Sequence, residues 1–71
     1  LFRSIGSGCR IGSNSYIGNS MLMENVLVGS DCVVHNAILG QGVVVPDGTR
    51  ALGDGAPLVV PDGRVITPSR N

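Results

Sequence analysis

The composition of this 71-residue chain limits what it can be. Five arginines balance five acidic residues, so the formal net charge of zero offers no bulk attraction for nucleic acid or an anionic membrane surface. The uninterrupted apolar runs are only a few residues long, too short to span a membrane. Yet 42% of the residues are hydrophobic, mostly small and branched, with 11 Gly, one Phe, one Tyr and no Trp. This combination favours a stack of similar narrow layers over an ordinary globular core.

An aliphatic residue recurs at nearly fixed spacing from residue 5 onward. These anchor residues are Ile5, Ile11, Ile17, Leu22, Val28, Val34, Leu39 and Val45. The steps between them are 6, 6, 5, 6, 6, 5 and 6, so two hexads and one pentad add up to a 17-residue repeat. An amphipathic helix would return its apolar stripe every ~3.6 residues, and hairpins would show two-residue turn signals. The spacing therefore predicts an all-β fold, a parallel β-helix of about three 17-residue coils, each a triangle of three short strands.

The repeat also predicts which side chains point inward. Equivalent residues of successive coils should stack about 4.8 Å apart, as neighbouring strands of a sheet do. The anchors are expected to face the interior, together with small residues four positions later: Cys9, Ser15, Cys32 and Thr49. Glycine often follows an anchor, which we interpret as a corner that needs a positive φ or close backbone approach. Asn19 and Asn36, one repeat apart, are expected to take the left-handed conformation at one stacked corner.

The regular spacing ends near Gly53. The segment Val60-Pro61-Asp62-Gly63 echoes Val45-Pro46-Asp47-Gly48, but the offset between them is two short of a full repeat. We therefore expect residues 58–66 to leave the helix as a short strand or loop that caps its open end. Such a cap would cover unpaired N–H and C=O groups, which could otherwise pair with other chains.

These boundaries give one domain in two parts. The coils are predicted over residues 1–54, and the C-terminal capping strand and tail over residues 55–71. The last residues, 67–71, are expected to be a frayed terminus. Because the chain begins at Leu1 and enters the repeat almost at once, we expect it to be a fragment of a longer protein.

One histidine and two cysteines carry the most reactive side chains. His35 could act as a general base or metal ligand, but no carboxylate or second ligand accompanies it at a readable spacing. It directly follows an anchor, so we interpret it as a structural residue at a solvent-facing corner. Cys9 and Cys32 are separated by one full repeat plus one hexad, which puts them on different faces of neighbouring coils. They are predicted to be free, buried thiols, suited to a reducing compartment.

Glycines and aspartates in this chain resemble two functional motifs. Gly6, Gly8 and Gly12 have the spacing G-x-G-x-x-x-G, which is one residue longer than a dinucleotide-binding loop, and no helix is predicted to follow. Corner geometry explains all three glycines. Asp47 and Asp62 each lie in a Pro-Asp-Gly sequence, which is favourable turn chemistry, so a pair of catalytic carboxylates is the weaker interpretation.

The arginines are dispersed along the chain. Arg3, Arg10 and Arg50 could contribute to a phosphate-effector pocket at a domain boundary, although a solvated surface is the simpler role for each. The sequence therefore assigns no catalytic, cofactor-binding or metal-binding residue, and no partner of nucleic acid or membrane type.

Two stretches of the repeat resemble a known family. Residues 20–29 (Ser-Met-Leu-Met-Glu-Asn-Val-Leu-Val-Gly) and 36–49 (Asn-Ala-Ile-Leu-Gly-Gln-Gly-Val-Val-Val-Pro-Asp-Gly-Thr) resemble the C-terminal β-helix of sugar-1-phosphate nucleotidyltransferases. They are most similar to glucose-1-phosphate adenylyltransferases (ADP-glucose pyrophosphorylases). Gly40 stands where those enzymes often have Asp, and mannose-1-phosphate guanylyltransferases share much of the repeat, so sugar and base stay open. The resemblance implies a left-handed helix, an exception to the usual right-handed crossover.

The resemblance also implies an assembly and regulatory role. Such a β-helix packs on an N-terminal catalytic domain of the same chain, contributes to a homo-oligomer and helps form a site for a small phosphorylated effector. The parent enzyme would use ATP and Mg²⁺, with no cofactor held by this fragment, and would reside in the cytoplasm or a plastid. Two other functions stay open. The chain could be a fragment of a hexapeptide-repeat acyltransferase, with His35 as its base, or a non-catalytic scaffold subunit.

Overall fold

The computed structural model describes residues 3–67, which form short strands arranged in three parallel sheets. The strands are β1 (Arg3–Ile5), β2 (Arg10–Ile11), β3 (Tyr16–Gly18), β4 (Ser20–Leu22), β5 (Leu27–Val28), β6 (Val33–His35), β7 (Ala37–Leu39), β8 (Val44–Val45), β9 (Arg50–Leu52) and β10 (Leu58–Val60). Sheet A has the order β1-β4-β7-β10, sheet B β2-β5-β8 and sheet C β3-β6-β9. Between residues 3 and 67 there is no helix, and hence no helical segment that could cross a membrane.

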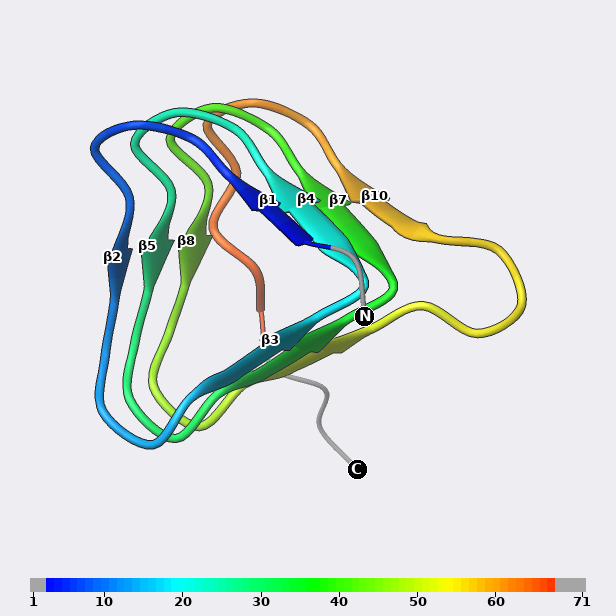
Figure 1. Ribbon diagram of the computed structural model, residues 1–71, viewed down its shortest axis with the longest axis horizontal. Coiled ribbons are helices and arrows are strands. Elements are labelled where there is room, and N and C mark those ends of the chain that lie inside the picture. Colours follow the sequence, from blue (N-terminus) through cyan, green and yellow to red (C-terminus); the bar gives the residue numbers. More distant parts are fainter. Residues whose placement is uncertain (1–2, 68–71) are drawn as a thin grey trace.

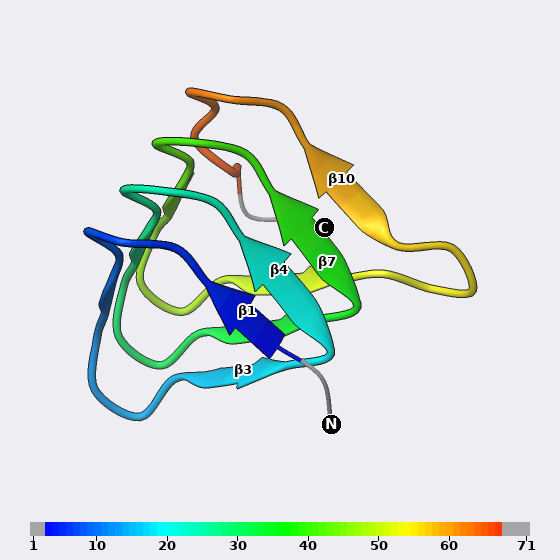
Figure 2. The ribbon, with the colours of Figure 1, turned by 45° about the horizontal axis from the view of Figure 1, so that its top comes forward.

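The three sheets are the faces of a triangular prism (Figure 1). In that view the chain runs counter-clockwise from β1 through β2 to β3, and each later coil lies behind the one before it. The tilted view in Figure 2 shows β1, β4, β7 and β10 stacked in this order. A chain that turns counter-clockwise as it recedes is a left-handed helix. The predicted fold and its hand are therefore confirmed, against the right-handed rule that most parallel crossovers obey.

The 17-residue repeat is the register of all three sheets. In sheet A, Ile5 pairs with Leu22 and Leu22 pairs with Leu39. The equivalent columns are Ile11, Val28 and Val45 in sheet B, and Ile17, Val34 and Ala51 in sheet C. Each predicted alignment of anchors is confirmed, because a coil that closes after one full repeat brings the same position directly above its predecessor.

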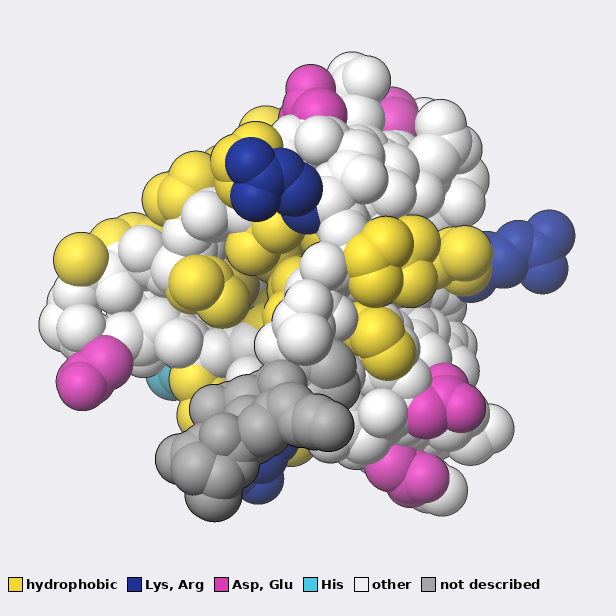
Figure 3. All heavy atoms as spheres, turned by 180° about the vertical axis from the view of Figure 1, so that it is seen from behind, with side chains coloured by type: hydrophobic (Ala, Val, Ile, Leu, Met, Phe, Trp, Pro, Cys, Tyr) yellow, Lys and Arg dark blue, Asp and Glu magenta, His cyan; other side chains and the backbone are white. Residues whose placement is uncertain are grey.

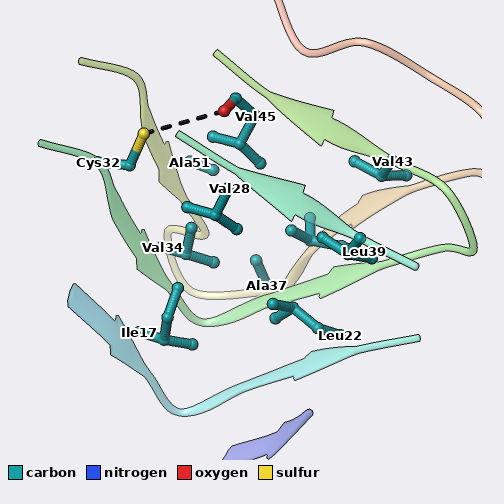
Figure 4. Packing of buried hydrophobic residues seen from close by; sticks show 11 residues of the cluster. Ile17, Leu22, Val28, Cys32, Val34, Ala37, Leu39, Val43, Val45 and Ala51 are labelled. Atoms are coloured by element: carbon teal, nitrogen blue, oxygen red, sulfur yellow. Dashed lines mark hydrogen bonds between the residues drawn. The ribbon is translucent and has the colours of Figure 1, made fainter. Parts of the chain in front are cut away.

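Stacked aliphatic side chains fill the prism (Figure 4). The buried hydrophobic residues are Ile17, Leu22, Val26, Val28, Cys32, Val34, Ala37, Leu39, Val43, Val45 and Ala51. From Leu22 to Val45 every anchor is at most 3% exposed, since it lies between the anchors of two neighbouring coils. Ile5 and Ile11 are 41% and 39% exposed because they begin the stack and have a coil on one side only.

The corners have two separate backbone requirements, a positive φ at one position and close backbone approach at another, whereas the sequence suggested a single requirement. Positive φ angles occur three residues after the anchor in hexads, as at Asn14 (61°), and two residues after it in pentads, as at Asn19 (45°) and Asn36 (54°). The prediction for these two stacked asparagines is confirmed. The glycine directly after an anchor has a different task, because a Cβ on Gly12 would lie 2.7 Å from the carbonyl carbon of Gly29. Close backbone approach, and not a positive φ, requires glycine there.

The segment after residue 57 forms part of a fourth coil. β10 pairs in parallel with β7, so that Val60 stacks on Leu39, and Val65 forms a parallel bridge with Val44. The expected C-terminal strand is present at the end of sheet A, but the prediction that it leaves the helix is wrong. Figure 3 views the prism from this end, where hydrophobic side chains lie across the middle and acidic side chains lie around the rim. Leu58, Val60 and Ile66 pack against the core and cover it.

A short insertion precedes this last coil. Leu39 and Val60 stack although the chain between them is longer than one repeat by four positions. The extra residues lie in the loop 53–57, which projects from the corner between sheets C and A (Figure 1). The N–H of Gly53 donates to the carbonyl of His35, and the N–H of Leu58 donates to that of Asn36, both at 3.0 Å, so the ladder closes on either side of the loop. Of the tail expected to fray, only Thr67 lies within the described residues.

Candidate functional site

A shallow cavity of about 200 Å³ lies beside the inserted loop, at the corner between sheets C and A. This corner cavity is lined by Asn19, Ser20, Met21, Asn36, Ala37, Ile38 and Pro57. The loop is held there by Asn36, whose Nδ2 donates to the carbonyl of Ala56 at 3.5 Å. The lining contains no charged side chain, and its only hydroxyl is already used. The Oγ of Ser20 donates to the carbonyl of Gly18 at 2.7 Å and accepts from the N–H of Ala37 at 3.1 Å. The cavity can therefore receive an apolar group but offers no nucleophile, acid or base.

His35 lies at the end of strand β6 and not at a turn, which corrects its predicted position. Its stacked neighbours on sheet C are Gly18 and Leu52, and its side chain is half-buried. Neither neighbour can share or receive a proton, so the rungs on both sides supply no catalytic partner. Within residues 3–67, no group of three or more His, Cys, Asp or Glu side chains is arranged to hold a metal ion.

The two cysteines are free, as predicted, and lie in neighbouring coils, but the prediction that both are buried is correct for only one of them. Cys32 is fully buried, and its Sγ donates to the carbonyl of Pro46 at 3.1 Å. Cys9 is only half-buried because it belongs to the first coil, and its Sγ donates to the carbonyl of Met23 at 3.0 Å. Each thiol thus bonds to the backbone of the next coil, as a small residue in an inward corner position should.

The aspartates of the two Pro-Asp-Gly turns do not meet. Asp47 lies at the corner between sheets B and C, and its Oδ1 accepts from the N–H of Ser30 at 2.9 Å. Asp62 lies at the corner between sheets A and B, where its Oδ1 accepts from the N–H of Gln41 at 2.8 Å. Each carboxylate lies against a glycine of the preceding coil, where a Cβ would collide with it. Each carboxylate therefore holds two successive coils together at its own corner, and the two aspartates do not form a catalytic dyad.

The remaining candidates are also separated by the fold. Gly6, Gly8 and Gly12 are followed by strand and turn and not by a helix, so they form no nucleotide loop. Arg3, Arg10 and Arg50 stand on β1, β2 and β9, which belong to three different sheets.

Sequence reasoning missed the corner cavity and its loop, although a signal for both was present. At this corner the two earlier coils take a pentad, from Ile17 to Leu22 and from Val34 to Leu39. The third coil takes a longer step, from Ala51 to Val60, and its extra residues include glycine and proline. When the steps at this one corner are compared, the third is longer than the other two, which reveals an insertion. The likeness of the two Val-Pro-Asp-Gly segments conceals it, because these segments occupy different corners of the triangle.

The geometry defines a class of protein. A left-handed parallel β-helix whose 17-residue coils consist of two hexads and one pentad is a hexapeptide-repeat domain. A family model described as "GlmU-like, C-terminal hexapeptide" matches residues 3–55, which is most of the chain. The chain belongs to this family.

Comparison with individual curated proteins gives a more specific similarity than the family model does. The chain is 39% identical over 51 residues to a glucose-1-phosphate adenylyltransferase of Cutibacterium acnes, a match that covers 70% of this chain and 12% of that protein. It is 41% identical over 46 residues to proteins of the same name from Trichlorobacter lovleyi and Frankia casuarinae, covering 65% of this chain and 11% of each relative. The chain thus spans about an eighth of the length of these relatives or less. No solved structure gives a significant match.

Proposed function

We propose that this chain is the C-terminal β-helix domain of a sugar-1-phosphate nucleotidyltransferase, and that it serves assembly and regulation. The parent reaction would be that of a glucose-1-phosphate adenylyltransferase, in which ATP and glucose 1-phosphate give ADP-glucose and pyrophosphate. Catalysis, ATP and Mg²⁺ would belong to an N-terminal domain of the same polypeptide. The β-helix would contribute to a homo-oligomer and to a site for a small phosphorylated effector, in the cytoplasm or a plastid.

One observation carries this proposal. The relatives named above all bear the name glucose-1-phosphate adenylyltransferase, and their similarity covers about two thirds of this chain or more. The described residues are consistent with a non-catalytic role, since the candidate acids, thiols and histidine are dispersed over different corners and sheets. A triangular prism with solvent-exposed side chains on three faces is suited to holding other domains in place.

A hexapeptide-repeat acyltransferase is the second candidate. It would use His35 as a base at the surface between adjacent prisms. The half-buried position of His35, between a glycine and a leucine on neighbouring rungs, argues against this role. Acyl-CoA binding by the intact protein, abolished by His35→Ala, would favour it.

The deciding experiment starts from the coding sequence upstream of Leu1. An α/β domain with a glycine-rich nucleotide loop is expected there. The complete protein should then release pyrophosphate from ATP and glucose 1-phosphate. A reading frame that opens shortly before Leu1, or that holds only more hexads, would refute the proposal. A complete protein that has the domain but is inactive with every sugar phosphate and nucleotide tested would indicate a scaffold subunit.

A further inference from the structure

Three Asp-Gly pairs occur in this chain: Asp47-Gly48, Asp54-Gly55 and Asp62-Gly63. In such a pair an aspartate rearranges readily without an enzyme, because glycine has no side chain to hinder attack by its own amide nitrogen. All three aspartates and their glycines are exposed to solvent. Exposure therefore does not distinguish the three pairs, and the difference between them lies in their hydrogen bonds.

Two of the pairs are bonded to the preceding coil at both of their reacting groups. In the pair Asp47-Gly48, the aspartate Oδ1 accepts from the N–H of Ser30 at 2.9 Å, and the glycine N–H donates to the carbonyl of Ser30 at 2.8 Å. The pair Asp62-Gly63 makes the same two bonds to Gln41, each at 2.8 Å. The carboxylate and the amide nitrogen that follows it are thus occupied in both pairs, so that neither group is free to turn toward the other.

The pair Asp54-Gly55 lies in the inserted loop 53–57 and makes no such bonds. Among residues 3–67, neither the carboxylate of Asp54 nor the N–H of Gly55 has a hydrogen-bond partner. Other groups hold the loop. The N–H of Ala56 donates to the carbonyl of Asp54 at 3.0 Å, across a three-residue turn in which Gly55 has a φ of 80°. The carbonyl of Ala56 accepts from Nδ2 of Asn36. These bonds leave the two reacting groups free.

We propose that Asp54 is a site of spontaneous isomerisation to isoaspartate, and that the fold restricts this modification to the inserted loop. In the first step the amide nitrogen of Gly55 attacks Cγ of the protonated side chain of Asp54. A bond forms between this nitrogen and Cγ, the bond from Cγ to its hydroxyl breaks, and the hydroxyl leaves with the amide proton as water. The product is a cyclic succinimide.

A water molecule then opens the succinimide at either of its carbonyl groups. Attack at Cγ breaks the new bond and restores aspartate. Attack at the main-chain carbonyl carbon breaks the original peptide bond, so that the chain runs through Cγ and the former main-chain carbonyl becomes a free carboxylate. The water lost in the first step is regained in the second, so the rearrangement needs no co-reactant. The enzyme class that acts on this new carboxylate is a carboxyl methyltransferase with a methyl donor.

The position of the loop limits the effect of this change on the fold. Isoaspartate adds a methylene group to the main chain, and the ladder bonds from the N–H groups of Gly53 and Leu58 lie on either side of the modified residue. The stack of coils therefore stays intact, while the wall that Pro57 contributes to the corner cavity lies close to the altered chain. The inference requires only the folded β-helix and holds whether or not the proposed function is correct.

Incubation of the complete protein under native conditions provides the test. Isoaspartate at each Asp-Gly pair is followed over time by peptide mapping with electron-transfer fragmentation, which distinguishes it from aspartate. Asp47 and Asp62 are matched controls in the same molecule. Isoaspartate is expected to form at Asp54 at least about tenfold faster than at either control, because two hydrogen bonds must break before a control pair can react.

Unfolding in guanidinium chloride separates the effect of the fold from that of the local sequence. The three rates are expected to become similar there, since the bonds that protect the two control pairs are lost. Similar rates in the native protein overturn the proposal, and so does a preference for Asp54 that is equally large in the unfolded protein. In the native protein, Asp54→Glu should remove most of the isoaspartate found at the three pairs, whereas Asp62→Glu should leave it unchanged. The opposite result also overturns the proposal.

Discussion

Substitution of one inward residue by aspartate tests the alternation of side chains along a two-residue strand. Val28 is 3% exposed on β5 and lies between Ile11 and Val45 of the neighbouring coils. Leu27, the residue before it, points outward and is 45% exposed. Val28→Asp would bury a carboxyl group between apolar rungs, whereas Leu27→Asp would leave one in water. The two variants have the same new charge at adjacent positions of the chain.

The expected losses differ severalfold. Removing a fully buried valine side chain costs about 1.5–3 kcal/mol. Ionisation of the buried carboxyl adds at most about 4 kcal/mol at pH 7, which is 1.36 kcal/mol per pH unit above its unfolded pKa of about 3.9. The sum, up to about 5.5–7 kcal/mol, is comparable with the whole stability expected for a chain of this length, about 4–11 kcal/mol. Leu27→Asp should cost about 1 kcal/mol or less, as surface substitutions usually do.

Urea unfolding followed by circular dichroism, at pH 7 and at pH 4, distinguishes the two variants. Burial raises the pKa of the new carboxyl group in the folded state above its unfolded value. The penalty is therefore absent below the unfolded pKa and grows as the pH rises, so Val28→Asp should recover up to about 4 kcal/mol relative to Leu27→Asp at pH 4. Equal unfolding midpoints for the two variants at pH 7 would refute the inward position of Val28.

Three further predictions concern the small residues of the corners, and a fourth concerns the thiols. Thr49→Val should be neutral or stabilise the fold by up to about 1 kcal/mol, because the buried Oγ1 has no hydrogen-bond partner among the described residues. Ser20→Ala should instead cost about 1–3 kcal/mol, since it removes the acceptor of the buried Ala37 N–H and leaves the carbonyl of Gly18 with only the N–H of Asn36 at 3.3 Å. Gly12→Ala should cost about 1–3 kcal/mol, because its Cβ would meet rigid backbone at 2.7 Å. Native alkylation should modify Cys9 before the fully buried Cys32.

Each of these has a direct measurement. Differences in the free energy of unfolding, from chemical denaturation, decide between the threonine and serine variants, and a large loss for Thr49→Val would mean that its hydroxyl has a partner. Gly48→Asn is the control for Gly12→Ala, because Gly48 has a φ of 75° that asparagine tolerates and open space around it. Equal stability of the two glycine variants would contradict the close approach at Gly12. Equal alkylation rates at both cysteines would contradict the burial of Cys32.

The register could be predicted because every coil repeats the same constraint. Ile5, Leu22 and Leu39 follow one another at intervals of one repeat in the sequence, and this spacing is also their order in space. In a stack of equal coils, residues that are one repeat apart in the sequence are neighbours in the structure. The same reasoning correctly excluded a disulfide between Cys9 and Cys32, since their separation places them at different corners.

The corner cavity could not be predicted in the same way, because it depends on an interruption of the period. The extra residues at one corner leave every stacked pair intact, so they appear in the sequence only as a loss of phase. The turn sequence at Asp62 has the same local chemistry as that at Asp47, and local chemistry does not identify which corner of the triangle a turn occupies. The sequence therefore predicts that the segment 58–66 leaves the β-helix, whereas in the structure this segment continues it.

The sequence alone determined the fold, the coil length, the inward columns and the membership of a repeat class. All of these follow from a spacing of aliphatic residues that recurs in every coil. The outward column of sheet A was decided only in part by the sequence. Met21 and Ile38 are one repeat apart and each directly precedes an anchor, but Val59 is out of phase with them by four positions and joins their column only through the pairing of β10 with β7. They become a surface only when three coils place them in one column beside the inserted loop, and the cavity exists only where that loop meets two stacked asparagines.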